Sequence, residues 1–89
     1  MSRIVTVNVT QRDIDSGECA NAHRCAIALA FSRATRRKYI SVGPISVSVI
    51  NRRGYCIQRG LLPKEARVFI ADFDSGRATR PFKFQVELA

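Results

Sequence analysis

Apolar and polar residues alternate in three stretches of the chain, and each stretch predicts a half-buried strand. From residue 5 on, every second residue of "RIVTVNV" (3–9) is a valine. "ISVSV" (45–49) alternates isoleucine and valine with serine, and "PFKFQVEL" (81–88) alternates phenylalanine, valine and leucine with polar residues. A period of two places successive side chains on opposite faces of a sheet. We therefore expect each stretch to bury one face.

The middle stretch is expected to form a hairpin with the residues that follow it. Pro44 cannot donate a ladder hydrogen bond, so it marks the start or the edge of the strand. "NRRG" (51–54) is a turn signal, and Gly54 can adopt the positive φ that such a turn requires. "YCIQ" (55–58) then forms the second strand, with two arginines near the tip.

Helix signals occupy the segments between the strands. Thr10 stands three residues before Asp13, the spacing of a capping box with aspartate in place of glutamate, and Gly17 closes this short helix. Asn21 is the expected N-cap of a second helix over residues 22–34. Alanine recurs at every fourth position along it, which would let the helix lie close to a sheet.

A third helix is expected after Pro63, which suits the first helical position. Apolar residues at 66, 69, 70 and 73 share one face, and Gly76 ends the helix. The element order is β-α-α-β-β-α-β, and residues 39–42 fit a further short strand. We predict a single α+β domain over residues 1–89, in which helices cover one face of a mostly antiparallel sheet of four to five strands.

The charge balance is the strongest deviation from an ordinary globular chain. Fifteen Lys and Arg residues face seven Asp and Glu, which gives a formal net charge of +8. Such a surplus favours nucleic acid, anionic lipid or an acidic protein surface as a partner. Many cations fall in connectors, and the tetrad "RATR" occurs at 33–36 and again at 77–80. The candidate contacts are Arg33, Arg36, Arg37, Lys38, Arg52, Arg53, Arg77, Arg80 and Lys83.

Two interpretations of these cations are open. One or two cations at the C-terminal end of a helix offset its dipole by about 0.3–1 kcal/mol each. The four cations between residues 33 and 38 are more than the helix dipole requires. If the connectors meet at one end of the sheet, the guanidinium groups can bind phosphates bidentately, with Thr35 and Thr79 as further donors. A solvated basic rim is the alternative.

Aromatic residues offer little support for base recognition. The chain has five phenylalanines, two tyrosines and no tryptophan, and most of these fall on expected core faces. Tyr39, beside Arg37 and Lys38, and Tyr55, beside Arg53, are the exceptions. The chain has no helix-turn-helix, zinc-finger or RNP signature, so sequence-specific binding of a nucleic acid is not expected.

The segment "CANAHRC" (19–25) raises two chemical alternatives. Cys19, His23 and Cys25, with Cys56 as a fourth ligand, could hold zinc, or a thiol could act as a nucleophile with the histidine as its base. The paired C-x-x-C spacing of structural zinc sites is missing, and no oxyanion-binding motif accompanies the cysteines. We therefore expect reduced, small buried thiols, with no metal and no cofactor.

Asp72 and Asp74 lie at the C-terminal end of the third helix, where the dipole disfavours negative charge. We expect them to pair with Arg77 or Arg80. The sequence carries no glycine-rich phosphate loop, catalytic triad spacing or dinucleotide fingerprint. It predicts a binding protein and not an enzyme, without a small-molecule substrate.

The lengths of the apolar runs indicate where in the cell the protein is expected. The longest, "CAIALAF" (25–31), is far shorter than the roughly 20 residues that span a bilayer. The start of the chain has no long apolar stretch followed by a small-residue cleavage site. We expect a cytoplasmic protein that does not contact membranes.

Three segments together resemble a set of small proteins of unknown function that phages and prophages encode. These are "VNVTQRDIDSGE", "RCAIALAFSRA" and "FIADFDSGRATRPFKFQVEL", with an Asp-x-Gly-Arg turn and a Pro-Phe-x-Phe final strand. Ala26 departs from the pattern, which has proline after the helix cysteine. The resemblance implies a viral or mobile-element origin, and it implies no catalytic residue.

Two functions follow as expectations. The first is a protein that uses its basic surface to bind nucleic acid or a host nucleoprotein complex. The alternative is a protein inhibitor of a host defence complex, of the anti-CRISPR type, that acts through protein contacts alone. Phosphate binding makes affinity fall steeply with salt, whereas a protein inhibitor depends on a discrete patch with an aromatic or arginine anchor.

Overall fold

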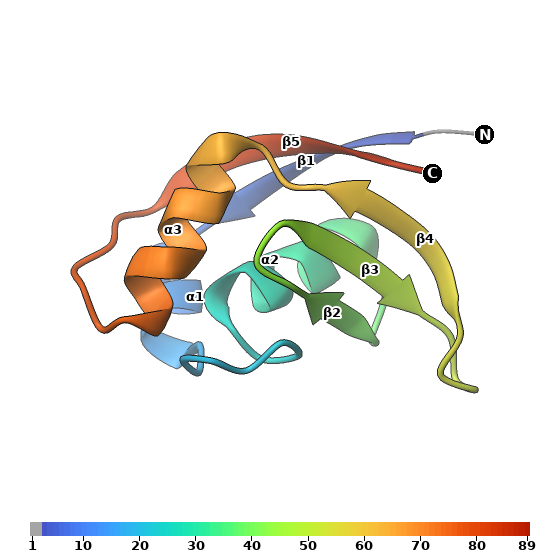
Figure 1. The fold of residues 1–89 in the computed structure, drawn as a ribbon, viewed down its shortest axis with the longest axis horizontal. Coiled ribbons are helices and arrows are strands. Elements are labelled where there is room, and N and C mark those ends of the chain that lie inside the picture. The colour runs from blue at the N-terminus through green and yellow to red at the C-terminus, as the bar shows by residue number, and fades with distance from the viewer. Residues whose placement is uncertain (1–2) are drawn as a thin grey trace.

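The fold was analysed in a computed structural model that describes residues 3–89 (Figure 1). It confirms the α+β class and the predicted order of elements, and the short strand expected near residues 39–42 is present. The elements are β1 (Arg3–Val9), α1 (Gln11–Ser16), α2 (Ala26–Thr35), β2 (Ile40–Val42), β3 (Ser46–Ile50), β4 (Cys56–Leu61), α3 (Lys64–Asp74) and β5 (Phe82–Leu88).

The five strands form two antiparallel sheets, whereas the sequence analysis expected one. The first pairs β1 with β5, from Arg3 opposite Leu88 onward, and the second has the order β2-β3-β4. The sheets meet where Arg59 and Ala89 exchange backbone N–H···O bonds of 3.0 and 3.1 Å. Next to this pair, a Cβ on Gly60 would lie 2.6 Å from the carbonyl oxygen of Glu87. The two ladders therefore touch at one point and do not merge.

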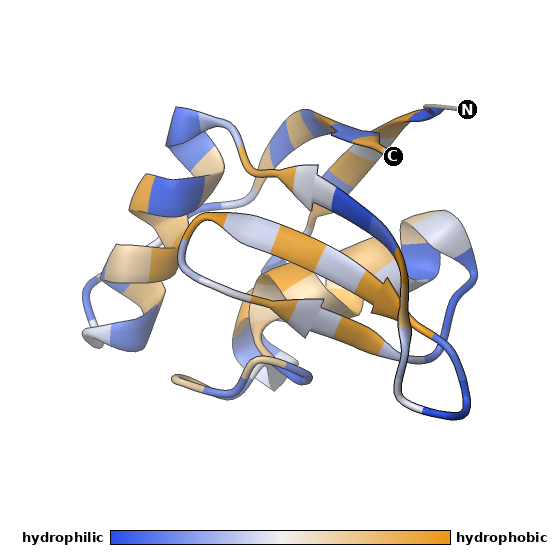
Figure 2. Ribbon diagram, turned by 45° about the vertical axis from the view of Figure 1, so that its right-hand side comes forward, coloured by the Kyte–Doolittle hydropathy of each residue, from blue (hydrophilic) through white to orange (hydrophobic). Residues whose placement is uncertain are grey.

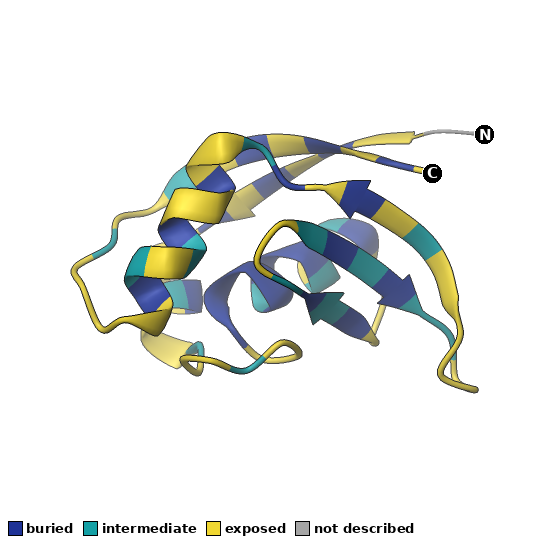
Figure 3. Cartoon of the chain, viewed as in Figure 1, coloured by how far each residue is buried: buried dark blue, intermediate teal, exposed yellow. Residues whose placement is uncertain are grey.

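Alternating burial along the strands defines the core between the sheets and the helices. The valines of β1 and, in β5, Phe84, Val86 and Leu88 are buried at every second position, as their periodicity predicted, and Phe82 is half-buried (Figures 2 and 3). From α2, Ile27 and Phe31 are fully buried, and Ala26 and Ala30 bring that helix close to its neighbours. Helix α2 contacts both β1 and β2, so it links the two sheets.

Helix α3 docks on β5 through phenylalanine rings. The ring centroids of Phe69 and Phe82 are 4.9 Å apart, and Phe73 and Phe84 extend this contact at 5.7 and 5.5 Å. Aromatic pairs in this range add about 0.5–1.5 kcal/mol beyond the area they bury. Gly76 ends the helical segment with φ of 77°.

The predicted capping box at the start of α1 is confirmed. The Thr10 hydroxyl accepts the Asp13 N–H at 3.2 Å, and the Asp13 carboxylate accepts the Thr10 N–H at 2.9 Å. The predicted start of α2 at residue 22 is wrong, because the helix begins at Ala26. Asn21 instead closes a turn, where its Oδ1 accepts the N–H groups of residues 23 and 24. The Cys25 sulfur caps the helix and accepts the Ala28 N–H at 3.4 Å.

Candidate nucleic-acid interface

The predicted basic residues separate into two groups at opposite ends of the molecule. The connector between α2 and β2 and the tip of the β3–β4 hairpin lie on one side, and the loop between α3 and β5 lies on the other (Figures 1 and 2). The longest extent of the molecule is 35 Å. The term basic end is used below for the first group, which consists of Arg36, Arg37, Lys38, Arg52 and Arg53.

The connector after α2 is held in place by its backbone. Arg36 ends the helix in the left-handed conformation, with φ of 58°. The Ser32 hydroxyl donates to the carbonyl oxygen of Arg37 at 2.5 Å. The carbonyl of Tyr39 accepts the N–H of Ile50 at 2.8 Å, which ties the connector to β3. The cationic side chains of the connector are exposed on an ordered backbone.

The hairpin tip is closed by Asn51. Its Oδ1 accepts the N–H groups of Arg53 at 2.9 Å and Tyr55 at 3.0 Å, and its carbonyl oxygen accepts the N–H of Gly54 at 3.0 Å. Gly54 has φ of 88°, so the positive φ expected of this turn is confirmed. Arg52 and Arg53 are therefore presented on a tight turn, and both are exposed.

A hollow of about 360 Å³ lies between the connector and the hairpin tip. Cations from both segments border it, and its floor is largely apolar. It is lined by His23, Lys38, Tyr39, Ile40, Ile50, Asn51, Arg52 and Gly54. Sequence reasoning did not assign Asn51 or His23 to this site. Asn51 could have been found as the first residue of the turn, whereas nothing local connects His23 to the hairpin.

Within residues 3–89, the cations of the basic end make no ion pair with an acidic side chain. None of the seven Asp and Glu residues lies between residues 19 and 64, the part of the chain that contains all of the basic end. Within residues 3–89 the ion pairs join Arg24 to Glu18, Arg33 to Asp13 and Arg77 to Asp72. The positive charge of the basic end is thus available to an external anion, because no carboxylate offsets it.

Arg33 was predicted as a contact, and its side chain is already bound within the fold. The guanidinium donates to both carboxylate oxygens of Asp13, at 2.8 and 2.7 Å, and to the carbonyl oxygen of Asn8 at 2.8 Å. Burial raises the pKa of the Asp13 carboxyl, but hydrogen bonds from Arg33 and Thr10 outweigh it and leave the pKa below 3.8. Arg33 therefore joins α2 to α1 and β1.

Thr35, proposed as a supplementary phosphate donor, is also occupied. It is buried, and its hydroxyl donates to the carbonyl oxygen of Phe31 at 2.8 Å. A threonine on a helix commonly bonds the carbonyl one turn back in this way. It is not available to a phosphate.

The second RATR segment does not join the first, so the condition that all the connectors meet at one end of the sheet is not met (Figure 1). Arg77 donates to Asp72 at 2.8 Å, which confirms the expected pairing for Asp72. The expected pairing is wrong for Asp74, whose carboxylate accepts the Ala20 N–H and makes no ion pair within residues 3–89. Arg80 and Lys83 are exposed, and both lie beside residues of α3. The reason is topological, because α3 and α2 end on opposite sides of the fold (Figure 1).

Cys19, His23 and Cys25 face different partners. The Cys19 thiol donates to the carbonyl oxygen of Phe73 at 3.1 Å, and His23 Nδ1 lies 2.9 Å from the carbonyl oxygen of Ile40. Only Cys25 is buried, so the expectation of buried thiols is wrong for Cys19 and Cys56. In the part of the chain described, no three His, Cys, Asp or Glu side chains gather as potential metal ligands.

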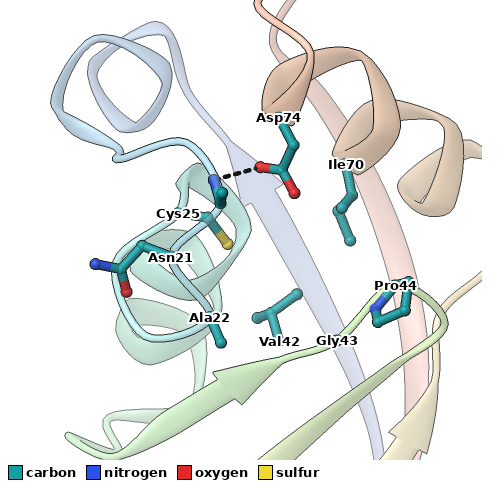
Figure 4. Close-up of a pocket in the computed structure, with 9 residues that line it drawn as sticks. Asn21, Ala22, Cys25, Val42, Gly43, Pro44, Ile70 and Asp74 are labelled. Carbon is teal, nitrogen blue, oxygen red and sulfur yellow. Dashed lines mark hydrogen bonds between the residues drawn. The ribbon is translucent and has the colours of Figure 1, made fainter.

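Cys25 lines a smaller pocket of about 200 Å³ between the loop before α2, the β2–β3 turn and α3 (Figure 4). Burial raises the pKa of its thiol, which keeps the sulfur protonated and weakly nucleophilic. The walls include Val42 and Ile70, and the Asp74 carboxylate at the rim accepts the Ala20 N–H at 2.9 Å. This pocket lacks the converging polar groups that mark a catalytic site.

None of the helices formed by residues 3–89 is both long and apolar enough to cross a lipid bilayer. Comparison with protein-family models, with curated proteins and with solved structures finds no match to this chain.

Proposed function

We propose that this protein binds nucleic acid, without catalysis, through the phosphates that its basic end attracts. The observation that carries the proposal is that two segments of exposed cations, residues 36–38 and 52–53, each contribute one cation, Lys38 and Arg52, to the lining of one hollow, and that none of these cations makes an ion pair within residues 3–89. Arginine forks match phosphate oxygens bidentately, and lysine adds a point charge. Hydrogen bonds within the connector and the hairpin tip constrain both backbones, which reduces the entropy that binding would otherwise cost.

The rest of the molecule supports the same assignment. Arg24, Arg33 and Arg77 are each paired with a carboxylate. Most of the net charge of +8 is therefore carried by the basic end, in a part of the sequence that contains no Asp or Glu. A localised positive region steers polyanions toward itself and speeds their association. Contacts of this kind bind phosphates without reading base sequence.

A protein partner is the second candidate, because apolar side chains are exposed beside and along β4. Leu61 is 74% exposed, Ile45 is 56% exposed and Ile57 is 45% exposed. Exposed apolar residues that lie near one another suit a protein interface. The resemblance to phage-encoded proteins makes a host nucleoprotein complex a natural target for either mode of binding.

The proposal is tested by replacing Arg36, Arg37 and Lys38 together with alanine. We expect the affinity for a labelled 20-mer to fall by about tenfold at 150 mM salt, because each lost phosphate contact removes a favourable release of counterions. The slope of log affinity against log salt should also become shallower. Fluorescence anisotropy at several salt concentrations measures both quantities, and the thermal midpoint should stay nearly unchanged.

A second triple variant separates the site from net charge. Arg67, Arg80 and Lys83 are exposed and make no ion pair within residues 3–89, and replacing them with alanine removes the same charge outside the basic end. This variant should bind nearly as well as the unmodified protein. Equal losses in the two triple variants would reduce the effect to net charge, and an absence of binding at physiological salt would favour the protein partner.

A further inference from the structure

We propose that the hollow at the basic end receives an unpaired base, so that the protein prefers single-stranded nucleic acid to duplex. This inference rests on the proposed function and narrows its ligand. Lys38 from the connector and Arg52 from the hairpin tip both line the hollow. A strand whose phosphates contact these two cations therefore carries its bases within reach of the hollow.

The lining of the hollow suits a planar heterocycle. Its volume of about 360 Å³ falls within the range of pockets that hold small organic groups. Tyr39, which is 51% exposed, lines it beside Ile50, whereas the side chain of Ile40 is buried in the core and offers a ligand little surface. Bases stack on exposed aromatic rings in sites that bind single strands, and this stacking tolerates any base.

Two polar groups on the wall complement the edge of a base. A carbonyl oxygen can only accept, so the contact of His23 with Ile40 places a hydrogen on Nδ1, and the tautomer with its single hydrogen there has Nε2 as an acceptor. The Oδ1 atom of Asn51 is used by the turn, whereas its Nδ2 makes no hydrogen bond within residues 3–89. Two residues that line the hollow thus carry a free donor, Asn51 Nδ2, and a free acceptor, His23 Nε2, within residues 3–89. The edge of a base contains both kinds of group and can pair with both.

Duplex nucleic acid cannot use these groups. Its bases are stacked and paired, and entry of one base would first require it to leave the helix at a cost of a few kcal/mol. A duplex would therefore contact the basic end through phosphates alone. A single strand gains the same phosphate contacts and the stacking on Tyr39 in addition.

The test compares ligands that differ only in their bases. Fluorescein-labelled dT12 is titrated by anisotropy beside an abasic 12-mer with the same phosphates and a 12-base-pair duplex, and rU12 decides whether DNA or RNA supplies the strand. We expect dT12 or rU12 to bind about tenfold more tightly than the abasic strand, the size of one stacked base. The duplex should bind more weakly than the better single strand, and a duplex that binds as tightly or more tightly would overturn the inference.

Variants of the two tyrosines assign the effect to the hollow. Tyr39→Leu should remove the difference between dT12 and the abasic strand, and Tyr39→Phe should keep it because the ring remains. Tyr55→Leu is the matched control. Tyr55 lies on the β3–β4 hairpin and is 66% exposed, but it does not line the hollow. Thermal midpoints measured for each variant confirm that the fold is kept.

The outcomes separate this inference from the proposed function. If dT12, rU12 and the abasic strand bind equally while the Arg36/Arg37/Lys38 variant still weakens binding, the base site is overturned and phosphate binding stands. A Tyr39→Leu variant that weakens all ligands equally, or a Tyr55→Leu variant that mimics it, also overturns the base site. If no oligonucleotide binds the unmodified protein, both proposals fail together.

Discussion

Gly60→Ala is expected to lower the free energy of unfolding by about 3 kcal/mol or more, because the two sheets touch at this residue. A Cβ there would lie 2.6 Å from the Glu87 carbonyl oxygen and 2.7 Å from Val86 Cγ2. Overpacking in cores typically costs about 1–3 kcal/mol, and contact with backbone leaves less room to relax than contact with a side chain. The Arg59–Ala89 hydrogen-bonded pair beside it should open as well.

The measurement is thermal and urea unfolding followed by circular dichroism. For a domain of this size, about 3 kcal/mol corresponds to a fall of more than 10 °C in the thermal midpoint. Gly43→Ala is the matched control, since its Cβ would meet nothing closer than 3.6 Å and its φ is not positive. That variant should stay within about 0.5 kcal/mol of the unmodified protein. Similar midpoints for the two variants would contradict the close approach of β4 and β5.

Arg33→Ala is expected to cost about 2 kcal/mol of stability, although the residue lies within a cationic run. It leaves the Asp13 carboxylate, whose side chain is 6% exposed, without its cation. Removing one partner of a fully buried pair costs about 3–5 kcal/mol. The expected cost is smaller here because Arg33 is 53% exposed and Asp13 keeps its hydrogen bonds with Thr10.

The pH dependence distinguishes this pair from a packing defect. The pKa of Asp13 lies below its ordinary value of 3.8 in the folded protein, so the unfolded chain binds the proton first as the pH falls. The stabilisation is therefore complete above the unfolded pKa and is lost as the pH falls through the lower folded pKa. The stability difference between the unmodified protein and Arg33→Ala should be constant above about pH 5 and shrink below about pH 4.

Arg37→Ala supplies the control for this series. Its side chain is exposed and makes no ion pair within residues 3–89, so its removal should change stability by less than about 0.5 kcal/mol at every pH. A loss as large as that of Arg33→Ala would show that the cationic run as a whole supports the fold. A pH-independent loss in Arg33→Ala would show that packing, and not the Asp13 carboxylate, is responsible.

The sequence by itself determined the features that depend on neighbours along the chain. The period of two in residues 3–9, 46–49 and 82–88 became strands with one buried face, because alternation fixes which side chains share a face. The expected burial of Ile45 is wrong, because this residue precedes β3 and is exposed. The capping box at Thr10 and the turn at Gly54 formed as predicted, since each requires residues only a few positions apart. The net charge and the short length of the longest apolar run could likewise be read without a structure.

The tertiary structure alone decided which cations are free. Arg33 and Arg36 lie in the same RATR segment, yet Arg33 is bound by a carboxylate twenty positions away and Arg36 makes no ion pair within residues 3–89. The division into two sheets and the meeting of Tyr39 with Asn51 around one hollow also depend on long-range packing. Local patterns carry no information on these contacts, because an ion pair or a pocket is set by distances in space and not by spacing along the chain.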